Sequence, residues 1–114
     1  MIEQSTEFER FFEFIRKDVH ENAKAHGWYD KPREDGTSIA LMHSELSEAL
    51  EAIRHGNPPD DHIPEFSGAE AELADVIIRI MDTAEFHGWR LAEAIIAKHN
   101  YNKTRPVMHG GKKF

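Results

Sequence analysis

The chain has 114 residues, a length typical of one domain with a modest hydrophobic core, so we expect a single domain over residues 1–114. Its 21 acidic and 14 basic residues give a formal net charge of −7, which disfavours binding to nucleic acid or to an anionic membrane. The chain has no cysteine, no signal-peptide pattern at its N-terminus and no membrane-length apolar run, so we expect a soluble, cytoplasmic protein without disulfides or thiolate metal sites.

Two helices are predicted in the first half of the chain. The first is expected over residues 6–27, where apolar side chains recur at helical spacing. The polar stretch 28–36 contains proline and glycine and is expected to form a loop. The second helix is expected to begin at a cap formed by Thr37 or Ser38 and to end at Arg54.

Two further helices are predicted in the second half. The segment 55–67 is rich in proline and glycine and is expected to be irregular. A Ser-x-x-Glu capping box then opens a helix over 68–86, and a fourth helix is expected from about residue 90 to residue 102. No segment shows strand alternation, and residues 106–114 have the composition of a flexible tail. The sequence therefore predicts an all-α domain, a compact four-helix bundle.

Two pairs of carboxylates occupy matching places on the second and third helices. On the second helix, Glu45 and Glu48 lie about 60° apart around the helix axis, beside an apolar stripe. On the third helix, Glu72 and Asp75 lie in the same way beside that helix's apolar stripe. If the two helices pack side by side, the four acids converge on one pocket. Like charges held so close need protons or a cation, and oxygen ligands favour Mg²⁺ or Mn²⁺. Such an ion would also let an acidic protein bind a triphosphate.

The apolar stripes beside these acids are the predicted core. The third helix carries more apolar surface than one neighbouring helix can cover, which predicts a homo-oligomer. The stripes consist of Ile39, Met42, Leu46, Ala49, Leu50 and Ile53 on the second helix and of Ala69, Leu73, Val76, Ile77, Ile80 and Ala84 on the third.

Further polar and aromatic candidates admit two interpretations each. Lys98, Asn102 and Arg105 continue the apolar stripe of the fourth helix, where they can donate to phosphate oxygens or simply cap the helix and face water. Trp28 follows a glycine near a helix end, where an indole can stack on a base or fill a gap in the core. A single ExxE or ExxD spacing is more typical of a solvated helix face, whereas two copies at the same offset on adjacent helices support a metal site.

The ExxE string followed by ExxD on the next helix resembles the all-α nucleoside triphosphate pyrophosphohydrolases, the family of MazG, the dCTP pyrophosphatases and the dimeric dUTPases. The strings HSELSEALEAIRHG and AELADVIIRIMD are most similar to the single-domain MazG-like branch, and the similarity covers about residues 27–112. The resemblance implies a MazG-type fold and a magnesium-dependent attack of water on the α-phosphorus of a nucleoside triphosphate. The products would be a nucleoside monophosphate and pyrophosphate. Because members of that family usually form dimers or tetramers, the resemblance also implies a homodimer or homotetramer.

The resemblance also implies roles for the acids. One of the second-helix glutamates, Glu45 or Glu48, would orient or deprotonate the attacking water in addition to binding metal. From the residues alone we predict that Arg79, one turn beyond the last acid, pairs with a ligand carboxylate. The implied metal ligands are Glu45, Glu48, Glu72 and Asp75.

The implied phosphate contacts are Lys98, Asn102 and Arg105, with Lys112 in the C-terminal HGGK string, while Trp28 is the candidate for contact with the base. The alternative function is a non-catalytic helical module that oligomerises or binds a partner and retains a residual metal site. A carboxylate-bridged di-iron bundle is disfavoured because neither acid-bearing helix has a Glu-x-x-His pattern. No motif indicates which base or sugar is preferred.

Overall fold

The computed structural model describes residues 6–106, and over that range the fold is all-α, as predicted. Its helices are α1 (Thr6–Ala25), α2 (Asp35–Arg54), α3 (Gly68–His87) and α4 (Leu91–Lys103), and the described range contains no strand. None of the described helices is both long enough and apolar enough to cross a membrane. The predicted tail from residue 107 onward, with Lys112, lies outside the described residues.

Most of the predicted helix ends agree with the structure. The start of α3 has the predicted capping box, in which Ser67 and Glu70 each accept a hydrogen bond from the other's backbone amide. The start of α2 was predicted wrongly. This helix begins at Asp35, ahead of the expected cap at Thr37 or Ser38, because the amide of Ser38 already donates to the carbonyl four residues earlier.

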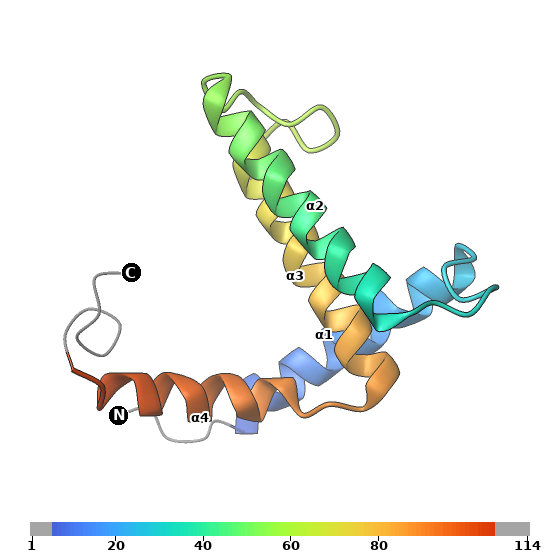
Figure 1. Cartoon of the computed structure of the whole chain (residues 1–114), viewed down its shortest axis with the longest axis vertical. Helices are drawn as coiled ribbons and strands as arrows, with labels where there is room; N and C mark the ends of the chain where they lie inside the picture. Colours follow the sequence, from blue (N-terminus) through green and yellow to red (C-terminus); the bar gives the residue numbers. More distant parts are fainter. Residues whose placement is uncertain (1–5, 107–114) are drawn as a thin grey trace.

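The helices are arranged around α3 (Figure 1). α2 and α3 form a long antiparallel hairpin, α1 crosses the C-terminal part of α3, and α4 lies against α1 and extends away from the hairpin. The radius of gyration is 16.5 Å, against about 13 Å for a compact domain of this length. The four predicted helices are confirmed, but the single chain is more open than the compact bundle that we expected.

The core is small and lies where α1, α3 and the start of α4 meet. Phe12, Met81 and Ala92 are buried there. Arg16 is buried in the same region, where its guanidinium donates to the carbonyl of Trp89 and lies 2.9 Å from the carboxylate of Glu85. A buried guanidinium needs such partners, and here they attach α1 to the junction of α3 and α4.

Much of the predicted core of the hairpin is exposed in the single chain. On α2 only Ala49 is buried, so the expectation that this stripe fills the core of one chain is wrong. Apart from Ala49, the stripe marks a surface that the helices described in residues 6–106 leave largely uncovered. The exposed apolar residues of the two predicted stripes are Ile39, Leu46, Leu50 and Ile53 of α2 and Leu73 and Ile77 of α3, each 44 to 58% exposed.

Candidate functional site

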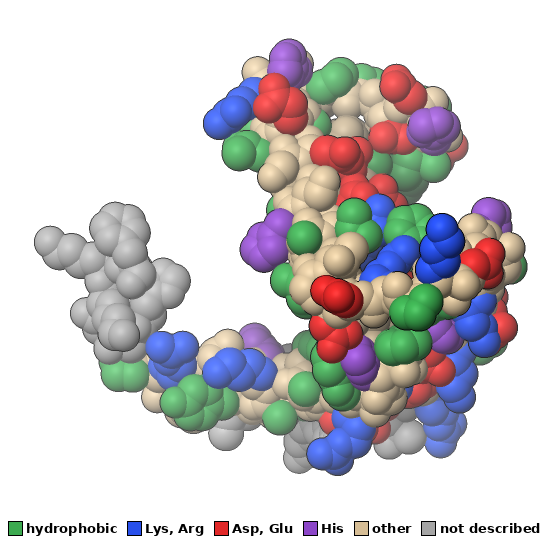
Figure 2. Space-filling model, turned by 45° about the vertical axis from the view of Figure 1, so that its right-hand side comes forward, with side chains coloured by type: hydrophobic (Ala, Val, Ile, Leu, Met, Phe, Trp, Pro, Cys, Tyr) green, Lys and Arg blue, Asp and Glu red, His purple; other side chains and the backbone are tan. Residues whose placement is uncertain are grey.

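α2 and α3 bring the predicted acids together. Carboxylate oxygens of Glu45, Glu72 and Asp75 lie within 4.8 Å of one another. Glu48, one turn beyond Glu45 on α2, is close enough to Glu72 to raise its pKa. We call these four residues the acid cluster. Figure 2 shows acidic side chains gathered over the hairpin directly beside basic ones.

The protonation of the acid cluster reflects burial first and the proximity of the other carboxylates second. Burial, followed by the hydrogen bonds with Glu45 and Glu48, raises the pKa of Glu72 to about 8. Burial and the charge of Glu45 also raise the pKa of Asp75. Burial would raise the pKa of Glu45 as well, but its hydrogen bonds with Arg79, Glu72 and Glu48 outweigh that effect and hold the pKa below 4.5. At neutral pH the cluster therefore retains a proton, mainly on Glu72.

The donor set of the acid cluster fits a hard divalent cation. All its ligand atoms are carboxylate oxygens, which magnesium and manganese prefer. Oε2 of Glu72 is buried and has no hydrogen-bond partner among residues 6–106. Because an unpartnered buried acceptor and crowded negative charges both cost free energy, a cation would relieve both. The acid cluster can therefore hold a metal ion.

Arg79 makes the predicted contact with an acid of the cluster. Its Nε donates to Oε1 of Glu45 at 2.9 Å, and Nη2 lies 2.8 Å from the same oxygen. Both side chains are largely shielded from solvent, so the pair is screened less than a surface ion pair. The guanidinium therefore fixes the orientation of one candidate metal ligand.

The substitution Arg79→Lys keeps the positive charge but loses the contact through two nitrogens. We expect it to weaken Mn²⁺ binding by about tenfold or more, because Glu45 is no longer held in one orientation. Calorimetric titration with Mn²⁺ measures this effect. The matched control is Arg54→Lys at the far end of α2, where Arg54 pairs at 3.6 Å with the exposed Glu51. Equal Mn²⁺ affinity in the two variants would contradict a positioning role for Arg79.

A cavity of about 200 Å³ lies beside the acid cluster, and we call it the acid cavity. Glu45, Asp75 and Arg79 line it together with Trp28, which comes from the loop between α1 and α2. Trp28 is 37% exposed, and its ring centroid lies 4.8 Å from the guanidinium carbon of Arg79. The indole proposed for base contact is thus a neighbour of the acids.

A buried polar network next to the acid cavity was not predicted from the sequence. Asp82, which also lines the cavity, is 8% exposed. It accepts a hydrogen bond from the Tyr29 hydroxyl at 2.8 Å and lies 2.7 Å from Nδ1 of His20. Burial and the bond to Asp82 raise the pKa of Tyr29. This network holds the loop that carries Trp28 against α1 and α3. Its sequence signal was the seven-residue step from Asp75 to Asp82, which continues the same helix face.

Three predicted phosphate-contacting residues lie away from the acid cluster within one chain. Lys98 and Asn102 are exposed on α4, and Arg105 is exposed just after it. α4 packs against α1 and points away from the hairpin (Figure 1). The Lys98 ammonium lies 4.9 Å from the ring centroid of Tyr101. To reach the acid cluster these side chains need a neighbouring chain or a movement of α4.

Comparison of the chain with protein-family models, curated proteins and solved structures found no match. The grounds for a function are therefore the acid cluster, the acid cavity and the motifs of the sequence. Within the described residues, the candidate site lies at the middle of the hairpin. It consists of the acids Glu45, Glu72 and Asp75 together with Arg79 and Trp28.

Proposed function

We propose that the chain is a metal-dependent nucleoside triphosphate pyrophosphohydrolase of the MazG-like type. The observation that carries this proposal is the convergence of acids from α2 and α3, since carboxylate oxygens of Glu45, Glu72 and Asp75 lie within 4.8 Å of one another. Their ExxE and ExxD spacing resembles that family's shared motif. The proposed reaction is hydrolysis of the bond between the α and β phosphates of a ribo- or deoxynucleoside triphosphate.

The acid cluster would hold magnesium, with manganese as an alternative. When bound, the ion supplies positive charge that offsets the negative charge of the phosphates in the transition state. Trp28 would contact the base from the wall of the acid cavity. Lys98, Asn102, Arg105 and Lys112 would contact phosphate only from a neighbouring chain or after a movement of the C-terminal segment.

Glu48 is the better candidate for accepting the proton of the attacking water. Glu45 is bound to Arg79 and its pKa is lowered, which makes it a weak base. Glu48 is exposed and forms no ion pair within residues 6–106, and its hydrogen-bond partners are the carboxyl groups of Glu45 and Glu72. In the proposed step the water oxygen bonds to the α-phosphorus, its proton passes to Glu48, and the α–β bridging oxygen leaves with pyrophosphate.

Product analysis tests the proposed function. Purified protein with Mg²⁺ and a panel of ribo- and deoxynucleoside triphosphates is expected to give monophosphate and intact pyrophosphate, with Glu48→Gln as the inactive control. The same panel identifies the preferred base and sugar. Release of orthophosphate would contradict cleavage at the α–β bond. A folded protein that binds Mg²⁺ but turns over no nucleotide would favour the non-catalytic oligomerising or partner-binding module.

We also propose that the chain is a homodimer or homotetramer. The exposed apolar residues of the hairpin support this, because a soluble monomer rarely leaves a contiguous apolar surface of this kind uncovered. Sedimentation equilibrium is expected to give two or four times the chain mass of 13.1 kDa. The substitution Leu50→Lys, at a half-exposed stripe position, is expected to shift the protein toward monomer. Ser44→Lys, on the opposite side of α2, is the control, and a monomeric wild type would refute the proposal.

A further inference from the structure

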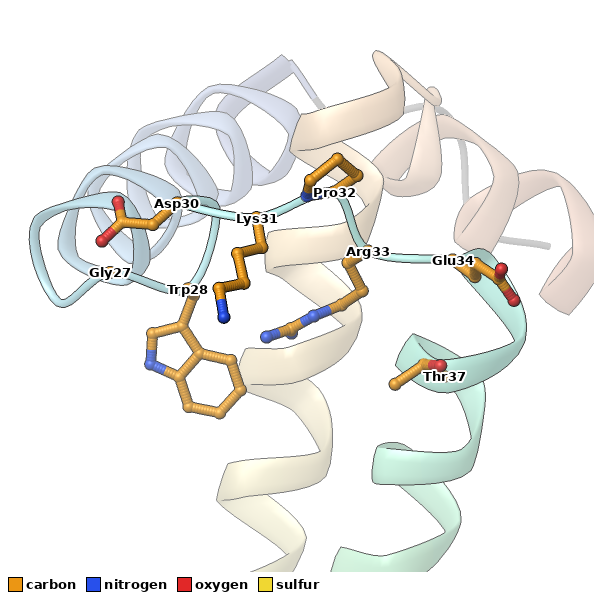
Figure 3. A pocket seen from close by; sticks show the side chains of 8 residues that line it. All are labelled: Gly27, Trp28, Asp30, Lys31, Pro32, Arg33, Glu34 and Thr37. Carbon is orange, nitrogen blue, oxygen red and sulfur yellow. The ribbon is translucent and has the colours of Figure 1, made fainter.

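A second cavity lies in the loop between α1 and α2 (Figure 3), and we call it the loop cavity. Its volume is about 650 Å³, and it is lined by residues of the segment 27–37. Trp28 lines both the loop cavity and the acid cavity. The two hollows are therefore neighbours that share one indole as a wall.

Two cationic side chains converge in the loop cavity. Figure 3 shows Lys31 and Arg33 directed toward Trp28, whereas Asp30 and Glu34 are directed toward the outer ends of the loop. The guanidinium carbon of Arg33 lies 4.7 Å from the ring centroid of Trp28. Neither Lys31 nor Arg33 forms an ion pair with a carboxylate in the described part of the chain. Asp30 and Glu34 also line the loop cavity, but their side chains are turned away from the space between Lys31 and Arg33. Two cations directed toward the same space form an anion-binding arrangement.

A continuous series of contacts joins this cationic pair to the acid cluster. Arg33 lies over the ring of Trp28, the guanidinium of Arg79 lies 4.8 Å from the same ring, and Arg79 binds Glu45. The acid cluster, which can hold a metal, and the cationic pair, which can hold an anion, are thus connected through one indole. A metal-bound polyphosphate has the chemistry that both groups require.

From this arrangement we infer that Lys31 and Arg33 bind the phosphate chain of the substrate, so that the loop between α1 and α2 supplies cationic contacts from the same chain as the acid cluster. This inference rests on the proposed function, which defines the substrate as a nucleoside triphosphate. Lys31 acts as a point charge, and Arg33 offers two parallel donors to phosphate oxygens. When Arg33 turns to phosphate it leaves the Trp28 ring, and that ring face becomes free for the base.

Binding of inorganic tripolyphosphate in the presence of Ca²⁺ tests this inference without turnover. The background variant is Trp89→Phe, because the chain has two tryptophans and Trp28 then becomes the sole indole. Tripolyphosphate is expected to change the Trp28 fluorescence. Calorimetric titration measures the affinity independently of fluorescence. By this measure Arg33→Ala is expected to weaken binding by about tenfold or more and Lys31→Ala by about threefold to tenfold, and Arg33→Ala is also expected to reduce the fluorescence change.

Two controls assign the effect to the loop. Arg54→Ala removes an arginine whose partner is the exposed Glu51, and it is expected to bind tripolyphosphate like the parent. Lys98→Ala tests α4 as the competing source of phosphate contacts, and its effect is expected to be smaller than that of Arg33→Ala. Parent-like binding by both Arg33→Ala and Lys31→Ala would overturn the inference. Circular dichroism establishes folding, and Arg33→Lys replaces Arg33→Ala if the latter does not fold.

Steady-state kinetics separates this inference from the proposed function. The loop variants are expected to raise KM for the preferred nucleotide more than they lower kcat, with partial rescue in Arg33→Lys. A wild type that hydrolyses nucleotides, with an unchanged KM in both loop variants, would refute the loop contacts alone. A wild type that hydrolyses none would refute the proposed function, and tripolyphosphate binding would still decide whether the loop binds a phosphate chain.

Discussion

Replacing Glu72 by glutamine is expected to lower kcat/KM for triphosphate hydrolysis by about 1000-fold. The amide cannot supply the anionic oxygen that a divalent ion requires, and the ion's share of transition-state stabilisation is several kcal/mol. Glu72 has a buried carboxylate oxygen without a hydrogen-bond partner among residues 6–106. We therefore expect the other acids of the cluster to compensate least for the loss of this ligand. Initial rates at saturating Mg²⁺ measure this effect.

The same substitution is expected to stabilise the metal-free protein. Glu72 has a pKa of about 8 because it is buried beside Glu45 and Glu48, so above that pH it carries a charge that its surroundings disfavour. A neutral amide of the same size removes the repulsion and can donate to the neighbouring carboxylates. We expect unfolding free energy to rise by roughly 1 kcal/mol in EDTA at pH 9.

Opposite effects on activity and stability distinguish a functional acid from a structural one. Chemical denaturation with EDTA at pH 9 gives the stability, and Glu51→Gln is the matched control, because Glu51 is an exposed acid of α2 whose ion pair with Arg54 spans 3.6 Å. This control is expected to leave the rate unchanged and to alter stability little. Loss of both activity and stability in Glu72→Gln would assign Glu72 a structural role, and retained activity would exclude it as a metal ligand.

The parts of this fold that the sequence predicts well are those set by local chemistry. The capping box of Ser67 and Glu70 involves residues three apart, so it depends on no distant contact. The acid cluster was predictable because both acid pairs have the same offset from an apolar stripe and their helices are consecutive in the chain. The contact of Arg79 follows from its position one turn beyond Asp75.

Other features depend on information that periodicity does not contain. An apolar stripe marks a buried surface but not the partner that buries it, and Leu46 and Leu50 on α2 are accordingly about half exposed in the single chain. The direction of α4, and with it the position of Lys98, depends on the short connection after Gly88. The stacking of Arg33 on Trp28 depends on the path of a loop without regular structure.

The second large effect is expected in two pH dependences, that of the folding stability of the metal-free protein and that of its affinity for Mg²⁺. The pKa of Glu72 is about 8 in the folded chain, against an ordinary value of 4.5. Below pH 4.5 Glu72 is protonated in both the folded and the unfolded state. As pH rises from 4.5 to 8 the unfolded state gives up this proton while the folded state keeps it, so the contribution of Glu72 to folding stability falls over that interval and is lost above pH 8.

Metal binding is expected to have the opposite dependence, because the ion needs the deprotonated carboxylate. The apparent Mg²⁺ affinity should rise by about tenfold per pH unit up to pH 8 and then level off. Melting curves with EDTA and with Mg²⁺ between pH 5.5 and 9 therefore measure a stabilisation by Mg²⁺ that grows with pH in the wild type. Glu72→Gln has no proton to release at this position, so its Mg²⁺ response should vary less with pH than that of the wild type, with Asp75 as the remaining acid of raised pKa. If the stabilisation by Mg²⁺ depends on pH in the same way in both proteins, Glu72 is not the acid that loses a proton when the cation binds.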